Sequence, residues 1–202
     1  MLYDKLETNS ISLMLDKFAV KELIEYERFC RDNALWEQMA ECYSDNSEVT
    51  ISWYHGDGKG FVKASSEMKL TAPHKLHNTL VWINGSRAAA VCMACVQTRK
   101  EIDGILLDLT SYVKLVYTAV KAEDSWIIAS LDAIYEKDCL VPTSPPNMKP
   151  ANGARPSYSN LINVIGYEGY DMNHDLPGDD RPDLRENLLL RVDNWLMSVP
   201  RS

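Results

Sequence analysis

Hydrophobic residues in the first quarter of the chain recur every three or four positions, the spacing of one face of an α-helix. This pattern predicts an amphipathic helix over 16–32. The residues outside its apolar stripe are charged: Lys21, Glu22, Glu25 and Arg28. Asp32 and Asn33 are good N-cap residues, so a second, shorter helix is expected over 34–43.

The pattern then becomes shorter and more interrupted. We expect a strand over 48–54, a glycine-rich turn over 55–60 and a short helix over 61–70. The glycine-rich turn lacks the Lys-Ser/Thr pair of a phosphate-binding loop, so it predicts a hairpin end or a bulge.

After Pro73, long β-type runs alternate with tight-turn signals. Asn84-Gly85 and Asp103-Gly104 suit type I′ hairpin turns, because both central positions need positive φ. The predicted strands are 74–83, 87–100, 105–120 and 126–135. Helices followed by an antiparallel meander predict an α+β domain, with the helices packed on one face of a curved sheet.

Proline usage divides the chain. Eight of the nine prolines lie beyond Val141, which predicts one domain over 1–140 and an irregular Pro-rich extension over 141–202. The extension should close with an amphipathic helix beginning near Pro182, whose apolar stripe is Leu184, Leu188, Val192 and Trp195. The stripe could be buried on the chain's own core or on a neighbouring subunit.

Composition excludes several classes of partner. Lys and Arg total 21 against 29 Asp and Glu, and a net charge of -8 disfavours nucleic acid. No signal peptide or long apolar span is visible, so we expect a soluble, cytoplasmic protein without a membrane partner. The five cysteines are scattered, which argues against a disulfide framework. Cys92 and Cys95 should face opposite sides of a strand and serve as buried thiols.

The segment 74–78, His-Lys-Leu-His-Asn, carries the most suggestive chemistry. Alternation along a strand would put His74 and Asn78 on one face and His77 on the other, so the two histidines should not share a metal ion. We therefore expect no metal and no cofactor. With an ordinary pKa of about 6.5, His74 is suited to act as a general base. The alternative is a partly buried histidine hydrogen-bonded to backbone.

The order of elements, together with Asp32 between the first two helices, His74 opening a strand and Ile-Tyr-Glu-Lys-Asp at 134–138, resembles the SnoaL-like, scytalone dehydratase-like branch of the NTF2-like (cystatin-like fold) superfamily. The resemblance covers roughly residues 10–140. It implies a cone in which the sheet and helices enclose an apolar pocket, and a dyad in which His74 removes a proton from carbon while Asp32 orients it.

Several further residues are candidates for the pocket. A straight first helix would turn Asp32 towards water, so the dyad requires that helix to end or bend at Arg31-Asp32. Glu27 lies within the apolar stripe, where a carboxylate must be paired, protonated or at the rim. Tyr26 is the candidate catalytic tyrosine. The expected substrate-binding residues are Glu27, Tyr54, His55, His77, Asn78 and Tyr112. Ordinary core packing is the alternative role for each tyrosine.

These observations lead to one functional hypothesis and two rivals. The hypothesis is a cofactor-independent lyase or isomerase, similar to a dehydratase or cyclase, that acts on a hydrophobic, cyclic small molecule and forms a homodimer or homotrimer. The rivals are a non-catalytic small-molecule-binding module and a scaffold subunit of a ring-hydroxylating dioxygenase. His74 and Asp32 within hydrogen-bond distance beside a cavity would favour chemistry. Asp32 capping a helix in solvent would favour binding.

Overall fold

The computed structural model describes residues 10–123 and 125–144, and in the C-terminal part residues 169, 173, 175, 180–184, 186–188 and 190. The chain divides into two compact units, Met1–Val141 and Pro142–Ser202. Each unit is described by itself.

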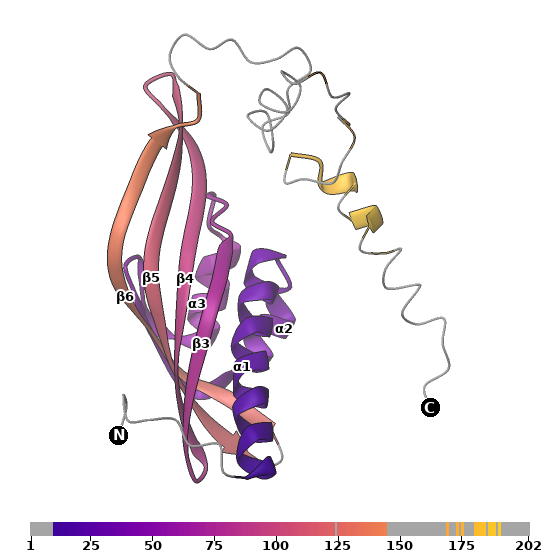
Figure 1. The fold of residues 1–202 in the computed structure, drawn as a ribbon, viewed down its shortest axis with the longest axis vertical. Helices are drawn as coiled ribbons and strands as arrows, with labels where there is room; N and C mark the ends of the chain where they lie inside the picture. The colour runs from indigo at the N-terminus through magenta and orange to yellow at the C-terminus, as the bar shows by residue number, and fades with distance from the viewer. Residues whose placement is uncertain are drawn as a thin grey trace. The chain divides into compact units, whose positions relative to one another are not determined.

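The N-terminal unit is an α+β structure, as the sequence predicts. Its elements are α1 (Ile11–Asp32), α2 (Trp36–Glu41), β1 (Tyr43–Ile51), β2 (Tyr54–Asp57), α3 (Gly58–Ser66), β3 (His74–Asn84), β4 (Arg87–Ile102), β5 (Ile105–Ala122) and β6 (Ser125–Pro142). The strands form one sheet in the order β2-β1-β6-β5-β4-β3. The long strands curve, and α1 lies along one face of the sheet (Figure 1).

Helix α1 begins earlier than predicted, because Ser10 is its N-cap. The Ser10 hydroxyl oxygen accepts a hydrogen bond from the Leu13 N–H at 3.1 Å. A search for an apolar stripe with a polar outer face misses the first turns of α1, because they expose apolar residues. These residues are Ile11, Met14, Leu15 and Phe18. The helix ends at Asp32, and Ala34 adopts a positive φ of 58°. The helix therefore ends at the residue where the predicted dyad requires it to end or bend.

The segment after α1 differs from the prediction in its boundaries. Strand β1 starts at Tyr43 rather than at residue 48, which shortens α2, and a second strand, β2, occupies part of the predicted turn. Asp57 caps α3 by accepting a hydrogen bond from Gly60 N–H at 2.7 Å, so this helix begins three residues early. A Cβ at Gly58 would meet Tyr43 Cδ1 at 2.6 Å, so only glycine allows this close approach.

A β-bulge in β3 corrects the predicted alternation of that strand. Leu76 pairs with Ala94, but Thr79 pairs with Cys92, so His77 and Asn78 together oppose one residue of β4. The extra residue exchanges the two faces beyond this point. His74 and Leu76 face the interior before the bulge, whereas the interior residues after it are Thr79, Val81 and Ile83 rather than Asn78, Leu80 and Trp82.

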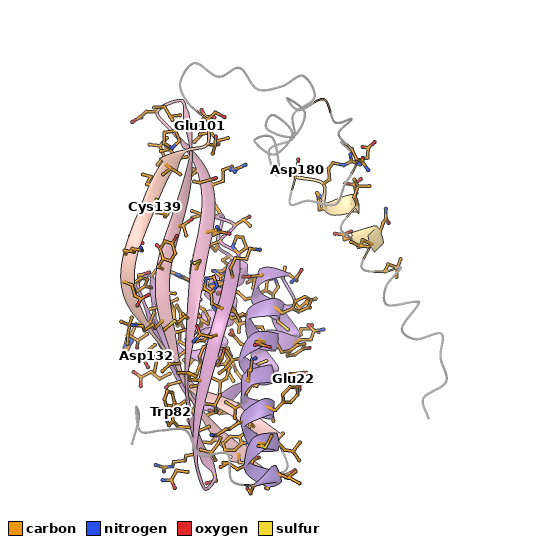
Figure 2. All side chains as sticks on the ribbon, viewed as in Figure 1. Glu22, Trp82, Glu101, Asp132, Cys139 and Asp180 are labelled. Atoms are coloured by element: carbon orange, nitrogen blue, oxygen red, sulfur yellow. The ribbon has the colours of Figure 1, made fainter. Side chains whose placement is uncertain are left out.

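The hydrophobic core lies between the concave face of the sheet and the helices. Its largest fully buried side chains include Tyr117, Phe61, Ile24, Met39, Ile128 and Leu131. Figure 2 shows Glu22 on the side of α1 turned away from the sheet and Asp132 of β6 on the side of the sheet turned away from α1. Among the described residues, no helix is both long enough and apolar enough to cross a membrane.

In the C-terminal unit, residues 182–184, 186–188 and 190 are helical, near the helix start predicted at Pro182. The Arg181 guanidinium pairs with the Asp183 carboxylate, with Nη2 and Oδ2 2.7 Å apart. Leu184 and Leu188 of the predicted stripe are half-buried. Val192 and Trp195 lie outside the described residues.

Candidate active site

His74 and Asp32 are in direct contact. His74 Nδ1 lies 2.8 Å from Asp32 Oδ1, and the His74 backbone N–H donates to Asp32 Oδ2 at 2.6 Å. The carboxylate thus binds the ring and the backbone of one residue. A carboxylate opposite Nδ1 favours the tautomer with its proton on Nδ1, which leaves the Nε2 lone pair free to accept a proton.

The end of a helix and the start of a strand bring these residues together. Asp32 is the last residue of α1, and His74 is the first residue of β3. The strand start is fixed to its neighbour because Gln97 N–H donates to the Pro73 carbonyl oxygen at 3.0 Å. Side-chain exposure is 6% for His74 and 15% for Asp32, so the pair is largely shielded from water. A shielded hydrogen-bonded pair of this kind holds a fixed geometry.

The protonation states follow from burial and charge. Burial is the largest influence on the pKa of His74 and lowers it below 6.5, against the Asp32 hydrogen bond, and the positive charge of Arg28 lowers it further. Burial alone would raise the pKa of Asp32, but the hydrogen bonds and charge of His74 bring it below 3.8. At neutral pH the site therefore holds a neutral imidazole beside an ionised carboxylate.

A buried ion pair lies behind the histidine. The Arg28 guanidinium binds the Glu27 carboxylate through two N–H groups, Nε at 2.5 Å from Oε2 and Nη2 closer still to Oε1. Tyr43 O–H donates to Glu27 Oε1 at 2.9 Å, and Tyr117 O–H donates to Oε2 at 3.3 Å. These four hydrogen bonds satisfy a carboxylate that has no exposed surface.

The pair keeps Arg28 charged and close to the imidazole. Burial would lower the pKa of Arg28, but the Glu27 carboxylate more than offsets this and holds it well above its ordinary value. Arg28 Nη1, which Glu27 does not use, lies 3.5 Å from His74 Nε2. This is a long, weak contact. A fixed positive charge thus stands beside the candidate base.

A second arginine borders the same space. Arg31 Nη1 donates to the Ala72 carbonyl oxygen at 3.2 Å and lies 3.4 Å from Asp32 Oδ1. Its Nη2 contacts the thioether sulfur of Met68 at 3.8 Å, and thioethers are weak acceptors. Burial and the nearby Arg28 lower the pKa of Arg31. The hydrogen-bonding capacity of Nη2 is consequently little used within the protein.

His74 and both arginines line a cavity of about 290 Å³. This is near the lower end of the size of small-molecule sites, roughly 300–1,000 Å³. The cavity lies under the concave face, with walls from α1, β1 and β3–β6. Its apolar lining includes Ile51, Trp53, Leu70, Val96, Leu109, Val113, Leu115, Leu131 and Ala133. Its few other polar residues are Ser52, Thr98, Ser111 and Tyr135.

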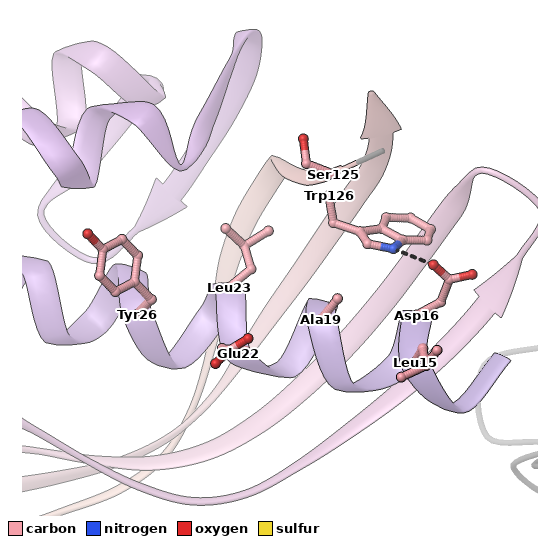
Figure 3. Close-up of a pocket in the computed structure, with 8 residues that line it drawn as sticks. All are labelled: Leu15, Asp16, Ala19, Glu22, Leu23, Tyr26, Ser125 and Trp126. Atoms are coloured by element: carbon pink, nitrogen blue, oxygen red, sulfur yellow. Dashed lines mark hydrogen bonds between the residues drawn. The ribbon is translucent and has the colours of Figure 1, made fainter. Parts of the chain in front are cut away.

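Tyr26, the expected catalytic tyrosine, lies outside this cavity. It is 45% exposed on α1, and it borders a separate open depression between α1 and the start of β6 (Figure 3). In that depression Trp126 Nε1–H donates to Asp16 Oδ1 at 3.0 Å. Tyr26 is one position before Glu27, and a rotation of about 100° per residue turns it away from the interior.

The expected substrate-binding residues Glu27, Tyr54 and His55 also do not line the cavity. Glu27 supports Arg28 from behind. Tyr54 O–H donates to the Asp57 carbonyl oxygen at 2.9 Å, and its ring packs on Phe61. His55 Nδ1 lies 3.0 Å from Thr50 Oγ1 in an exposed part of the β1–β2 hairpin.

The remaining three expected residues lie away from the interior. His77 Nε2 lies 3.1 Å from Cys95 Sγ on the outer face of the sheet, and Asn78 is exposed in the bulge. Tyr112 is also on the outer face, where Lys137 Nζ lies 5.0 Å from its ring centre. In β5 the odd-numbered residues from Leu109 to Leu115 face the cavity. The even-numbered Tyr112 therefore faces the other side of the sheet.

The predicted site residues do not include the other polar and aromatic residues that line the cavity: Arg28, Arg31, Ser52, Trp53, Thr98, Ser111 and Tyr135. The helical pattern placed Arg28 on the solvent side, but the residue is only 3% exposed. The available signal was Glu27 itself, because a carboxylate in an apolar stripe needs a cation beside it. The Tyr135 hydroxyl oxygen accepts a hydrogen bond from Ser52 N–H at 2.9 Å, a contact across 83 positions of the chain that no local pattern reveals.

The described side chains do not form a metal site. Among the described residues, no group of three or more His, Cys, Asp and Glu side chains is placed to hold a metal ion. Cys92 and Cys95 are both buried and free, with Cys92 on the inner face and Cys95 beside His77. The expected absence of a cofactor stays a prediction.

Some known proteins are similar to this chain in sequence, and others are similar in fold. No family model matches the chain. A PEP2-like protein of Fusarium vanettenii is 25% identical over 91% of this chain and 87% of its own length. Pea pathogenicity protein 2 of the same fungus is 26% identical over 66% of this chain and 60% of its own length.

Solved structures show the fold. A type 2 hexachlorocyclohexane dehydrochlorinase superposes with a TM-score of 0.53 at 12% identity and covers 64% of this chain and 93% of its own. A scytalone dehydratase candidate from Novosphingobium aromaticivorans superposes with a TM-score of 0.51 at 14% identity and covers 67% and 96%. The protein therefore has the NTF2-like, cystatin-like fold, and its predicted resemblance to the scytalone dehydratase-like branch is confirmed at the level of the fold.

Proposed function

We propose that the protein is a lyase that removes a proton from carbon in a small, largely apolar molecule, with His74 as the base. The contact between His74 and Asp32 beside the cavity carries this proposal. The two structural relatives named for dehydrochlorination and dehydration support elimination as the type of reaction. Association into a homo-oligomer and a cytoplasmic location stay predictions.

The arrangement suggests how each group contributes. A substrate carbon placed against His74 Nε2 would give up its proton while Asp32 stabilises the imidazolium that forms. A positioned base contributes roughly 10²- to 10⁴-fold in rate. The apolar walls exclude water, which strengthens the electrostatic contacts inside the cavity. The low pKa of His74 keeps the ring unprotonated, and therefore ready, at neutral pH.

A non-catalytic binding role is the rival proposal. It would need a polar group in the cavity only for orientation, and it would not need a base with a free lone pair. The shielded carboxylate at Nδ1 favours the catalytic proposal, because it fixes the tautomer that makes Nε2 basic.

The test uses the purified full chain in deuterated water with hexachlorocyclohexane, scytalone and a panel of apolar β-hydroxyketones. NMR detects elimination products and loss of exchangeable C–H signals. We expect activity on at least one compound, and we expect His74→Gln to reduce it by about 10²-fold or more. His55→Gln, on the exposed hairpin, is the matched control and should keep full activity. Full turnover in His74→Gln would overturn the mechanism.

A further inference from the structure

Two guanidinium groups and one imidazole lie together in the wall of a largely apolar cavity. His74, Arg28 and Arg31 all line it. Arg28 carries five N–H donors, and Glu27 occupies two of them. Within the described part of the chain, Arg28 Nη1 makes only the 3.5 Å contact with His74 Nε2, and Arg31 Nη2 makes only the 3.8 Å contact with the sulfur of Met68. Arg28 Nη1 thus lies beside the nitrogen that would act as the base, and Arg31 Nη2 has a weak partner in the wall of the same cavity.

The part of the cavity wall around His74 carries no net charge only while His74 is neutral. Glu27 offsets Arg28, and Asp32 offsets Arg31. When His74 accepts a proton, the wall gains one positive charge in a shielded environment, where an uncompensated charge is costly. A negative charge that appears on the substrate at the same moment would restore the balance.

We propose that Arg28 and Arg31 form an oxyanion site beside His74, and that the cavity takes apolar molecules with one oxygen that is, or becomes, anionic. This inference rests on the proposed function and deepens it. It assigns to arginines the role that the sequence suggested for Tyr26, which lies outside the cavity.

With a ketone or ester as substrate, proton removal precedes elimination. The C–H bond next to the carbonyl breaks, and the proton forms an N–H bond at His74 Nε2. The electron pair moves through the carbonyl group, so the negative charge develops on the oxygen between the two guanidinium groups. If the C–O bond of a hydroxyl group on the next carbon then breaks, the electron pair returns from the oxyanion, the C=O bond is restored and a C=C bond forms. The leaving hydroxide takes the proton from His74 and departs as water.

The oxyanion site can be tested without knowing the natural substrate. 2-Naphthol and 2-methylnaphthalene have nearly the same shape, but only naphthol can become an oxyanion. Fluorescence titration is done at a pH below the pKa of free naphthol. We expect naphthol to bind about 10-fold or more tightly than methylnaphthalene, with the absorbance spectrum of the bound naphtholate.

Variants assign the effect to the arginines. Arg31→Met should abolish most of the preference for naphthol. The double variant Glu27→Gln/Arg28→Met removes both members of the buried ion pair, so it avoids leaving one buried charge unpaired, and it should also lose the preference. Arg99→Met is the matched control, because Arg99 pairs with Asp108 on the sheet away from the cavity. A thermal melt verifies that each variant is folded.

The outcomes separate this inference from the proposed function. Equal binding of the two probes, or a naphthol preference that survives both arginine changes, overturns the oxyanion site alone. Failure of both probes to bind overturns the cavity as a ligand site and the proposed function with it. His74→Gln should still prefer naphthol over methylnaphthalene, because the arginine donors remain, so failure of His74 as a base would not affect this result.

Discussion

His74 Nδ1 lies 2.8 Å from Asp32 Oδ1, although the two residues are 42 positions apart in the chain. The end of α1 and the beginning of β3 meet beside the cavity, and the same carboxylate binds the His74 backbone N–H. One residue therefore fixes both the orientation and the tautomer of the candidate base.

Asp32→Asn should lower the pKa of His74 further. The Asp32 carboxylate stabilises the imidazolium, whereas an amide in its place has no charge to do so, and burial and Arg28 already act in the lowering direction. NMR titration of the imidazole signals measures the change, with the signals of the exposed His55 as an internal reference. An unchanged or raised pKa for His74 would mean that the carboxylate does not control this ring.

Stability should fall on mild acidification, in part because of His74. Its pKa is lowered in the folded protein, so below about 6.5 the unfolded chain binds a proton that the folded protein resists. This stabilisation is complete above the unfolded pKa and is lost as the pH falls towards the folded pKa. Asp32 acts in the same direction at pH values below about 3.8. Melting temperatures at neutral and mildly acidic pH measure the loss.

The matched variant for this effect is His74→Gln, which does not titrate. Its melting temperature should differ less between the two pH values than that of the original protein. Identical pH dependence in both proteins would show that other groups cause the loss of stability.

Glu27→Ala should destabilise the fold by about 3–5 kcal/mol, because it leaves the buried Arg28 without a counter-charge. It also removes the acceptor of the Tyr43 and Tyr117 hydroxyl groups. Urea denaturation measures the free energy of unfolding. The double variant Glu27→Gln/Arg28→Met should recover most of this loss. If the double variant is no more stable than Glu27→Ala, the ion pair is not the source of the cost.

Ala133→Phe should block the cavity. Ala133 is a half-buried wall residue of β6, and a phenyl ring there would occupy space that a ligand needs. Affinity for 2-methylnaphthalene should fall by about 10-fold or more, which corresponds to about 1.4 kcal/mol. The control is Ile134→Phe on the outer face, where the side chain is 49% exposed. Equal loss in both variants would place the ligand elsewhere.

Local sequence patterns accounted for the order of elements, the hairpin turns at Asn84-Gly85 and Asp103-Gly104, and the α+β class. These features depend on periodicity and turn chemistry, which neighbouring residues determine. Element boundaries were less accurate where a cap or a strand pairing decided them, as at Ser10, Asp57 and Tyr43.

Tertiary structure decided which residues form the site. The bulge at His77 and Asn78 changes the face of every later residue in β3, and it becomes visible only when β3 is paired with β4. Arg28 is buried because Glu27 is buried beside it, against the outward position that helical spacing assigned. The sequence by itself determined most of the elements, and its resemblance to a known superfamily supplied the pairing of His74 with Asp32. Only the folded chain could surround that pair with two arginines, because charge, burial and distance between remote segments are properties of packing.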